Sequence, residues 1–204
     1  GEFGSTTGML YSPDQNYEYH FEYATYSEDL PLRAKAQGID SSRFSLDMNY
    51  HSDDYVWEAA GGLSRYQFSD TNNRYTYFAS LGYGFEMLPQ REQRLIGSVY
   101  RSQNSLADTV YYNPRQDLSY GMTYEMSFIY DSQFDRHVDR AYVYLGNYSQ
   151  ADYPTKPVWR LGFSQDYTFN DVHSLYWELS WGREVYDGDR ESAASVLISY
   201  GYRF

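Results

Sequence analysis

The chain lacks cysteine in all of its 204 residues, which excludes disulfides, a thiol nucleophile and a zinc–thiolate site. It has no run of 18 apolar residues, so no transmembrane helix is expected. Leucine is scarce, with 15 residues, although a helical bundle would be rich in it. Basic residues are outnumbered, 16 against 28 acids. The net charge of −12 argues against a nucleic-acid partner and favours cationic ligands.

Aromatic residues are abundant, with 26 Tyr, 11 Phe and 4 Trp, and they alternate with polar residues. In 118–130, for example, every second residue is large and apolar or aromatic, and most residues between them are polar or glycine. This period of two is typical of β-strands. The pattern predicts eleven strands, at 6–12, 16–27, 41–51, 55–67, 73–86, 93–102, 117–130, 138–150, 157–169, 173–186 and 190–204.

Several of these strands are longer than those of soluble sheets, and aromatic residues stand at both ends of their apolar faces. The opposite faces are polar and rich in glycine, which suits a wet interior. We therefore predict an all-β fold, an antiparallel up-and-down transmembrane β-barrel of the outer-membrane type. A soluble β-sandwich is the alternative, and it would leave a large aromatic face exposed.

The connections alternate between short turns and generally longer loops, as in outer-membrane barrels with short periplasmic turns. The end of the chain, with Tyr200, Tyr202 and Phe204 at period two, resembles the assembly signal of bacterial outer-membrane barrels. If this signal lies on the periplasmic side, the longer loops at the other end of the strands face the cell exterior. Because single-chain bacterial barrels have even strand numbers, eleven strands suggest part of a larger barrel. We interpret residues 1–5 as a cloning scar and 6–204 as the barrel portion.

Four sequence blocks resemble the C-terminal barrel of the poly-β-1,6-N-acetylglucosamine export porin family. They are Asp29–Ala34 with Gly38–Ile39, Phe68–Asp70 with Asn73–Arg74, Tyr111–Leu118, and Gly182–Asp189 with Glu191. The resemblance implies a monomeric exporter of partially de-N-acetylated, and therefore cationic, poly-N-acetylglucosamine in the outer membrane of Gram-negative bacteria, serving biofilm formation. It also implies contact with outer-membrane lipid and the barrel-assembly machinery. A periplasmic deacetylase is implied as the partner of an N-terminal helical-repeat region that is absent from this sequence.

If the aromatic side of each strand faces lipid, the other side faces the lumen and is acidic. The predicted lumen acids are Glu18, Glu22, Asp47, Glu58, Glu86, Glu125, Asp166, Glu178 and Glu184. Arg160 and Arg203, and less securely Arg94 and Arg140, lie among them. Such acids would attract the ammonium groups of the polymer through weak, repeated contacts, as translocation requires. The alternative is that they only hydrate the interior and pair with its arginines.

The resembling loop motifs supply a second set of candidate residues. These are Pro31, Arg33, Tyr112, Asn113, Pro114, Asp117, Arg183, Tyr186, Asp187 and Asp189. Asp187–Gly188–Asp189 is also a tight hairpin signal, and Asn113–Pro114 is turn chemistry, so a structural role is favoured over sugar contact. Lumen aromatics such as Tyr26, Phe78 and Tyr176 are candidates for stacking on sugar rings.

No catalytic, cofactor or metal motif is evident, and the four histidines lack metal-ligand spacing. We therefore do not expect an enzyme. Three rivals to a polymer exporter stay open at this point. They are a general diffusion porin without polymer specificity, an outer-membrane enzyme acting on lipid or glycan, and a soluble β-rich adhesion module.

Overall fold

A computed structural model describes residues 4–25, 32–106, 109, 111, 113–132, 135–169, 172–186 and 188–202. The elements are β1 (Ser5–Tyr11), β2 (Tyr17–Thr25), α1 (Leu32–Ala36), β3 (Ser41–His51), β4 (Trp57–Phe68), β5 (Asn73–Leu88), β6 (Arg91–Asn104), β7 (Gln116–Asp131), β8 (Asp135–Gln150), β9 (Lys156–Phe169), β10 (His173–Tyr186) and β11 (Asp189–Tyr202). None of the helical residues described forms a segment long and apolar enough to cross a membrane.

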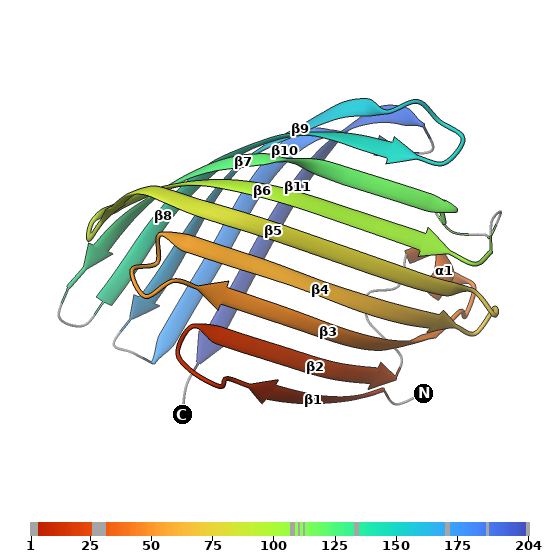
Figure 1. The fold of residues 1–204 in the computed structure, drawn as a ribbon, viewed down its shortest axis with the longest axis horizontal. Coiled ribbons are helices and arrows are strands. Elements are labelled where there is room, and N and C mark those ends of the chain that lie inside the picture. The colour runs from red at the N-terminus through yellow and green to blue at the C-terminus, as the bar shows by residue number, and fades with distance from the viewer. Residues whose placement is uncertain are drawn as a thin grey trace.

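The eleven strands form one sheet in sequence order, and each pairs antiparallel with its neighbours in the chain. The sheet curves so that β2–β6 and β8–β11 make opposite walls (Figure 1). β1 and β11 are its two edges, and no pairing joins them among the residues described. The eleven predicted strands and their antiparallel order are confirmed.

Two kinds of connection lie at opposite ends of the sheet, and we name the ends after them. The turn end carries 12–16, 52–56, 89–90, 132–134 and 170–172, and the loop end carries 26–40, 69–72, 105–115, 151–155 and 187–188. The turn predicted over 87–92 is only Pro89–Gln90, because β5 and β6 continue further than expected. Figure 1 shows α1 at the loop end and the C-terminus at the turn end.

Two short segments differ from the sequence-based assignment. β1 begins at Ser5, one residue before the predicted strand 6–12, and the Ser5 amide donates to Thr25 Oγ1 at 2.9 Å. The connection predicted as the loop 28–40 contains helix α1. Gly38 adopts φ +69° after α1, the left-handed conformation in which glycine commonly ends a helix. The amides of Gln37 and Ile39 both donate to the Ala34 carbonyl at 3.0 Å.

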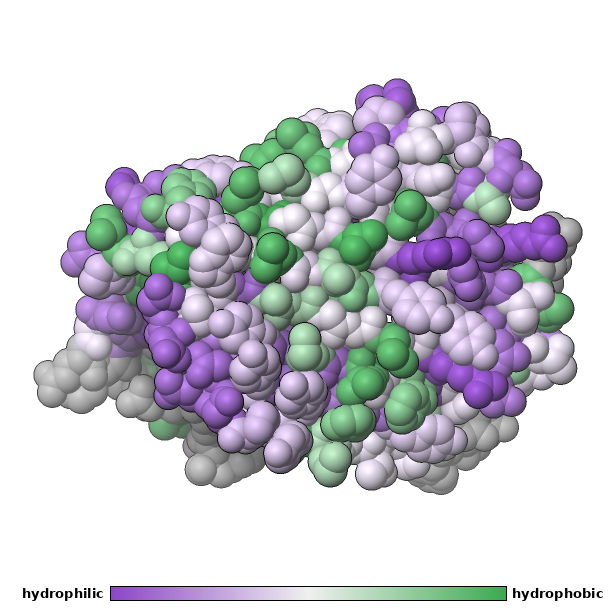
Figure 2. All heavy atoms as spheres, in the orientation of Figure 1, coloured by the Kyte–Doolittle hydropathy of each residue, from purple (hydrophilic) through white to green (hydrophobic). Residues whose placement is uncertain are grey.

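The aromatic and aliphatic residues of the predicted lipid side lie exposed on one face of the sheet, the outer face. Ile198 is 69% exposed and Leu145 is 62% exposed, values expected only if another apolar phase covers them. Figure 2 shows hydrophobic residues gathered over the middle of the face seen there, with hydrophilic ones toward the strand ends. All four tryptophans, Trp57, Trp159, Trp177 and Trp181, share the outer-face parity. The outer face therefore has the pattern of a membrane-facing surface.

The inner face carries mainly small, polar side chains and glycines, and the residues described form no central hydrophobic core on it. Its most buried residues are serines and other polar groups, such as Ser45, Ser102 and Ser164. The buried apolar cluster instead lies at the loop end, where Ala34 of α1 contacts Phe68 of β4 and Tyr111 of the 105–115 loop. The rings of Phe68 and Tyr111 are stacked with centroids 5.5 Å apart. Two connections thus pack against the inner side of the strand ends.

Glu86 lies on the outer face, and its predicted lumen position is wrong. A β-bulge between Gly84 and Glu86 adds one residue to β5, so the alternation reverses after it. Glu86 then pairs with Gln93 and accepts hydrogen bonds from Gln93 and Arg91, which share a face. That face is the outer one, because Gln93 also accepts from the exposed Tyr124 at 2.5 Å.

Candidate functional site

The inner face collects acidic side chains from six strands, and we take it as the candidate functional site. The cross-strand register places eight of the nine predicted acids on this face, namely Glu18, Glu22, Asp47, Glu58, Glu125, Asp166, Glu178 and Glu184. In these strands, inner and outer side chains alternate without a bulge up to and beyond each acid. The period of two in the sequence therefore assigned these acids to the correct face. Only Glu86, beyond the bulge, is displaced to the outer face.

Arginines on the inner face pair with about half of these acids. The ion pairs are Arg43–Glu22, Arg94–Glu58, Arg160–Glu184 and Arg140–Glu125, the last at 3.4 Å. Arg94 also contacts Glu92 at 3.2 Å. The predicted inner positions of Arg94, Arg140 and Arg160 are confirmed, whereas Arg203 lies outside the described residues. Arg43 was missed, although extending the alternation of 44–51 by one residue identifies it.

Other inner acids have no cation within ion-pair distance. Among the described residues this holds for Glu18, Asp47 and Asp166. Glu178 is held by two phenols, since Tyr142 donates to it at 2.8 Å and Tyr176 at 2.5 Å. Free carboxylates facing water form a set of weak sites for a passing cation, each worth roughly 0.2–1 kcal/mol. The inner face is therefore partly neutralised and partly open to cationic groups.

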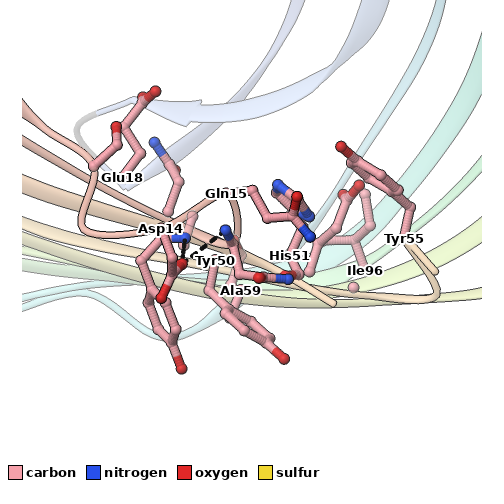
Figure 3. Close-up of a pocket in the computed structure, with 16 residues that line it drawn as sticks. Asp14, Gln15, Glu18, Tyr50, His51, Tyr55, Ala59 and Ile96 are labelled. Atoms are coloured by element: carbon pink, nitrogen blue, oxygen red, sulfur yellow. Dashed lines mark hydrogen bonds between the residues drawn. The ribbon is translucent and has the colours of Figure 1, made fainter. Parts of the chain in front are cut away.

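A hollow of about 470 Å³ lies on the inner side at the turn end. Figure 3 shows Asp14, Gln15, Glu18, His51 and Tyr55 gathered around it. Asp14 Oδ1 accepts from the amides of Asn16 and Tyr17 at 2.8 and 3.1 Å, which fixes the 12–16 turn at the rim. Glu58 of β4 completes the acidic lining. A cation entering from the turn end meets this acidic hollow first.

A second hollow, of about 640 Å³, lies against the wall formed by β6–β10. Three tyrosines of β8, Tyr142, Tyr144 and Tyr148, line it together with charged residues of neighbouring strands. Glu125, Arg160 and Glu184 are the charged residues on the same inner face. The hollow therefore combines aromatic rings with carboxylates. Of the predicted lumen aromatics, Phe78 and Tyr176 are on the inner face, and Tyr26 lies outside the described residues.

At the loop end a fully buried side chain, Asn72, joins the 69–72 connection to the 105–115 connection and to the end of β6. Its Nδ2 donates to Asn104 at 3.2 Å, to Tyr111 at 3.1 Å and to Asn113 at 3.3 Å. Its Oδ1 accepts from Ser105 Oγ and from the Leu106 amide at 3.2 and 3.1 Å. Sequence reasoning missed Asn72, which lies between two quoted blocks, because a lone asparagine in a turn carries no long-range signal.

Tyr111 belongs to the same cluster and contributes a titratable group. Its hydroxyl donates to Asp70 Oδ2 at 3.0 Å, while its ring stacks on Phe68. Burial is the main cause that raises the pKa of the Tyr111 hydroxyl above its ordinary range. The cluster is therefore built around the neutral phenol. It holds the 105–115 loop against the 69–72 turn.

Four of the predicted loop-motif residues, Asn113, Pro114, Asp117 and Asp189, have structural partners. The Asn113 side chain donates to the Leu106 carbonyl at 2.7 Å, and the Pro114 carbonyl accepts from Asn104 at 2.7 Å. Asp117 Oδ1 accepts from the Ser102 amide at 2.9 Å. Asp189 begins β11 and lies 3.8 Å from Lys156 Nζ. These contacts hold the loops against one another and against the strand ends.

The remaining sequence-predicted residues are placed as follows. Gly188 has φ +76° in the 187–188 hairpin, as the predicted tight turn requires. Tyr200 and Tyr202 point outward on β11, and the Tyr200 hydroxyl lies 2.7 Å from His173 Nδ1. Arg183 shares the outer-face parity of β10, and for Arg33 and Tyr186 only the backbone is described. Pro31, Tyr112, Asp187 and Phe204 lie outside the described residues.

Comparison with known proteins agrees with this architecture. The family model described as the PgaA membrane beta barrel domain matches residues 1–204. The chain is 25% identical over 202 residues to the poly-beta-1,6-N-acetyl-D-glucosamine export protein of Escherichia coli strain K12, and equally to the protein of that name from Escherichia coli O157:H7. These matches cover 98% of this chain but only 25% of each relative. The chain thus spans a quarter of the length of the curated relatives it matches.

Solved structures give the same fold. A bacterial polysaccharide outer membrane secretin superposes with a TM-score of 0.92 at 25% identity, covering 98% of this chain and 69% of that one. LpxR from Salmonella typhimurium and the beta domain of the Bordetella autotransporter BrkA superpose at 0.53 and 0.54, with 10% and 13% identity, covering 98% of this chain and 88% and 91% of theirs. The predicted fold class and outer-membrane localisation are confirmed. The curated relatives and the secretin are named for export or secretion, in agreement with a chain that is not an enzyme.

Proposed function

Because the chain belongs to the PgaA membrane beta barrel domain family, we propose that it forms part of the wall of a conduit that exports partially de-N-acetylated poly-β-1,6-N-acetylglucosamine across the outer membrane. The loop end then faces the cell exterior and the turn end faces the periplasm. The single observation that carries the mechanism is the set of inner carboxylates without a cation partner, Glu18, Asp47 and Asp166, among the residues described.

The inner face suits a polymer that is mostly neutral and carries scattered ammonium groups. Uncompensated carboxylates attract the ammonium groups, while the arginine–carboxylate pairs present polar but nearly neutral wall to the acetylated units. Contacts worth roughly 0.2–1 kcal/mol each retain the chain without stalling it. The acidic hollow around Glu18 and Glu58 stands at the periplasmic mouth and is the entry site in this proposal.

Two further partners follow from the resemblance alone. The outward tyrosines of β11 support recognition of this strand by the barrel-assembly machinery. The periplasmic deacetylase would contact a region beyond this sequence. Both stay predictions.

The test is a titration of the 204-residue chain in detergent micelles with β-1,6-linked glucosamine oligomers, either fully acetylated or partially de-N-acetylated, at low and high salt. We expect tighter binding of the amine-bearing oligomer and weakening of this preference by salt. The triple variant Glu18→Gln, Asp47→Asn, Asp166→Asn should lose about 0.6–3 kcal/mol of binding free energy for the amine-bearing oligomer, the sum of three separate exposed contacts.

Glu86→Gln is a control for position, since it removes one carboxylate charge from the outer face. It should leave binding unchanged. Equal affinity of the triple variant and the unaltered chain would contradict the acidic-conduit mechanism. Block of conductance by neutral sugars as readily as by glucosamine oligomers would indicate a general diffusion porin instead.

A further inference from the structure

We propose that the inner wall carries aromatic platforms on which the pyranose rings of the polymer stack, with the main platform formed by Tyr142 and Tyr144 of β8. This inference rests on the proposed export function and adds a second mode of recognition to the carboxylates. It concerns the acetylated as well as the deacetylated units, because stacking needs the C–H face of a sugar and no charge.

The first observation is that glycines make room for these rings. Tyr142 faces Gly162 across β8 and β9, and a Cβ at Gly162 would collide with the Tyr142 ring. A Cβ at Gly146 would lie 2.6 Å from Tyr144 Cζ, and one at Gly121 would lie 2.7 Å from Tyr144 Cε2. Both rings therefore lie along the wall, over backbone without side chains, and do not project across the lumen.

The second observation is that the phenol groups are tied to the wall. Tyr142 donates to Glu178 at 2.8 Å, and Tyr144 lies 3.3 Å from Ser119 Oγ. Tyr148, the third inner tyrosine of β8, donates to Asp117 at 3.2 Å. Because the polar ends are satisfied by neighbours, the ring faces are what the wall offers to a ligand. Fixed rings also lose little conformational entropy when a ligand stacks on them.

The third observation is the setting of the rings in a hollow. The 640 Å³ hollow is lined by Tyr142 and Tyr144 together with Glu125, which faces Tyr142 across β7 and β8. An apolar ring face beside a carboxylate matches a glucosamine unit, whose sugar face is apolar and whose nitrogen is cationic when deacetylated. The hollow is thus suited to both kinds of unit.

The arrangement recurs on the opposite wall. Phe78 of β5 faces Gly62 of β4, and a Cβ at Gly62 would lie 2.5 Å from Phe78 Cε1. The Asp47 carboxylate lies over the same glycine. Phe78 has no hydroxyl, so hydrogen bonding cannot explain an aromatic residue at this inner position, and the residue is 40% exposed. Two separate aromatic-over-glycine sites, each beside an acid, fit a polymer that repeats the same unit.

The experiment measures binding of fully acetylated β-1,6-linked N-acetylglucosamine oligomers to the chain in detergent micelles. Calorimetry gives the affinity, and proton NMR gives the ring-current shift of the pyranose C–H protons. Tyr142→Leu and Tyr144→Leu should each weaken binding roughly 3- to 10-fold, as expected for loss of one aromatic contact, and should reduce the upfield shifts. High salt should not change these effects, because no charge is involved.

Matched variants separate stacking from other roles. Tyr142→Phe and Tyr144→Phe keep the ring over its glycine and lose only the hydroxyl, so they should keep most of the affinity that the Leu variants lose. Gly162→Val keeps Tyr142 but displaces its ring from the wall, so it should behave like Tyr142→Leu. Tyr120→Leu, on the outer face of β7, is the negative control. Heat-dependent gel mobility verifies that each variant is folded.

The outcomes are distinct. In one outcome the unaltered chain binds the oligomers with upfield shifts of the pyranose C–H protons, and the Leu variants bind equally well. This result overturns the proposed stacking on Tyr142 and Tyr144, and the export proposal stands. If the Phe variants lose as much affinity as the Leu variants, the hydroxyls and not the rings recognise the sugar, which also overturns the platforms. If the unaltered chain binds neither the acetylated nor the deacetylated oligomer, the export proposal fails and the platforms fail with it.

Discussion

At the loop end, residues from connections far apart in the sequence meet on one buried side chain, whereas at the turn end most connections are held by bonds within themselves. Asn72 contacts Asn104 and Asn113, which are 32 and 41 positions away. In the 12–16 turn, Asp14 binds amides two and three positions away, and in the 52–56 turn, Asp54 binds Ser52 Oγ at 2.6 Å. A single substitution should therefore disturb residues further away in the sequence at the loop end than at most turns of the turn end.

The largest expected effect is that of Asn72→Ala. Removing the side chain leaves Leu106 N, Ser105 Oγ and the neighbouring amides without partners in a buried site, which should cost about 2–4 kcal/mol of local stability. Trypsin should then cleave after Arg115, at the end of the 105–115 loop, much faster than in the unaltered chain. Hydrogen exchange should rise in both 69–72 and 104–113. If exchange rose in only one of these segments, the loop end would be no more connected than the turn end.

Tyr111→Phe sharpens the comparison, because it keeps the ring on Phe68 and removes only the hydroxyl. We expect a loss of about 1–2 kcal/mol, from the bonds to Asp70 and Asn72. Cleavage after Arg115 under the same conditions is the measurement. A larger loss than that of Asn72→Ala would show that the phenol, and not the amide, is the centre of the cluster.

The same residue predicts a pH dependence. The pKa of Tyr111 is raised in the folded chain, so its contribution is fully present below the ordinary pKa of tyrosine, and it is lost as the pH rises through the folded value. Cleavage after Arg115 should accelerate in alkaline solution in the unaltered chain. Tyr111→Phe provides the control and should show a smaller alkaline rise. An equal rise in both would assign the effect to other groups.

Asn16→Ala tests a link between two turns at the turn end. Its Nδ2 donates to the His51 carbonyl at 2.8 Å and to Asp53 Oδ1 at 2.7 Å. Loss of these partly exposed bonds should cost about 1 kcal/mol. Hydrogen exchange should increase in 12–16 and around His51, with 105–115 unaffected. Increased exchange at the loop end would contradict the separation of the two ends.

Asp54→Asn should have the smallest effect. Hydrogen bonds from Ser52 and from the Val56 amide lower the pKa of the Asp54 carboxyl, which is fully exposed to solvent. The stabilising contribution is therefore present above the ordinary carboxyl pKa and is lost as the pH falls through the lowered value. The amide chemical shift of Val56 should titrate with Asp54 in the unaltered chain and not in Asp54→Asn. Cleavage after Arg115 should be identical in both.

Period-two alternation predicted the strands and the faces because a strand with water on one side and lipid on the other must alternate. Eight of nine predicted inner acids follow directly from it. The exception, Glu86, lies beyond a bulge that adds one residue, and the pattern Gly84–Phe85–Glu86 contains no sign of that addition. The side on which a residue lies is thus predictable only as far as the register continues without a bulge.

The loop end was less predictable than the strands. The sequence identified Asn113 and Pro114 as turn residues but not Asn72, whose role depends on the 69–72 and 105–115 connections and the end of β6 meeting in space. The sequence pattern assigned the glycines of the inner face to the polar side of their strands. Which aromatic ring lies over which glycine depends on the cross-strand register. Local chemistry is readable from the sequence, whereas contacts between distant segments require the folded sheet.

The placement of the four tryptophans decides what ultraviolet fluorescence can report about this protein. Trp57, Trp159, Trp177 and Trp181 all share the outer-face parity, so their emission should respond to insertion into detergent or lipid. The inner face contributes no tryptophan emission, because every indole of the sequence is on the opposite side of the sheet. A polymer moving along the wall should leave the emission almost unchanged. A single tryptophan introduced at Phe78 would place a reporter on its path.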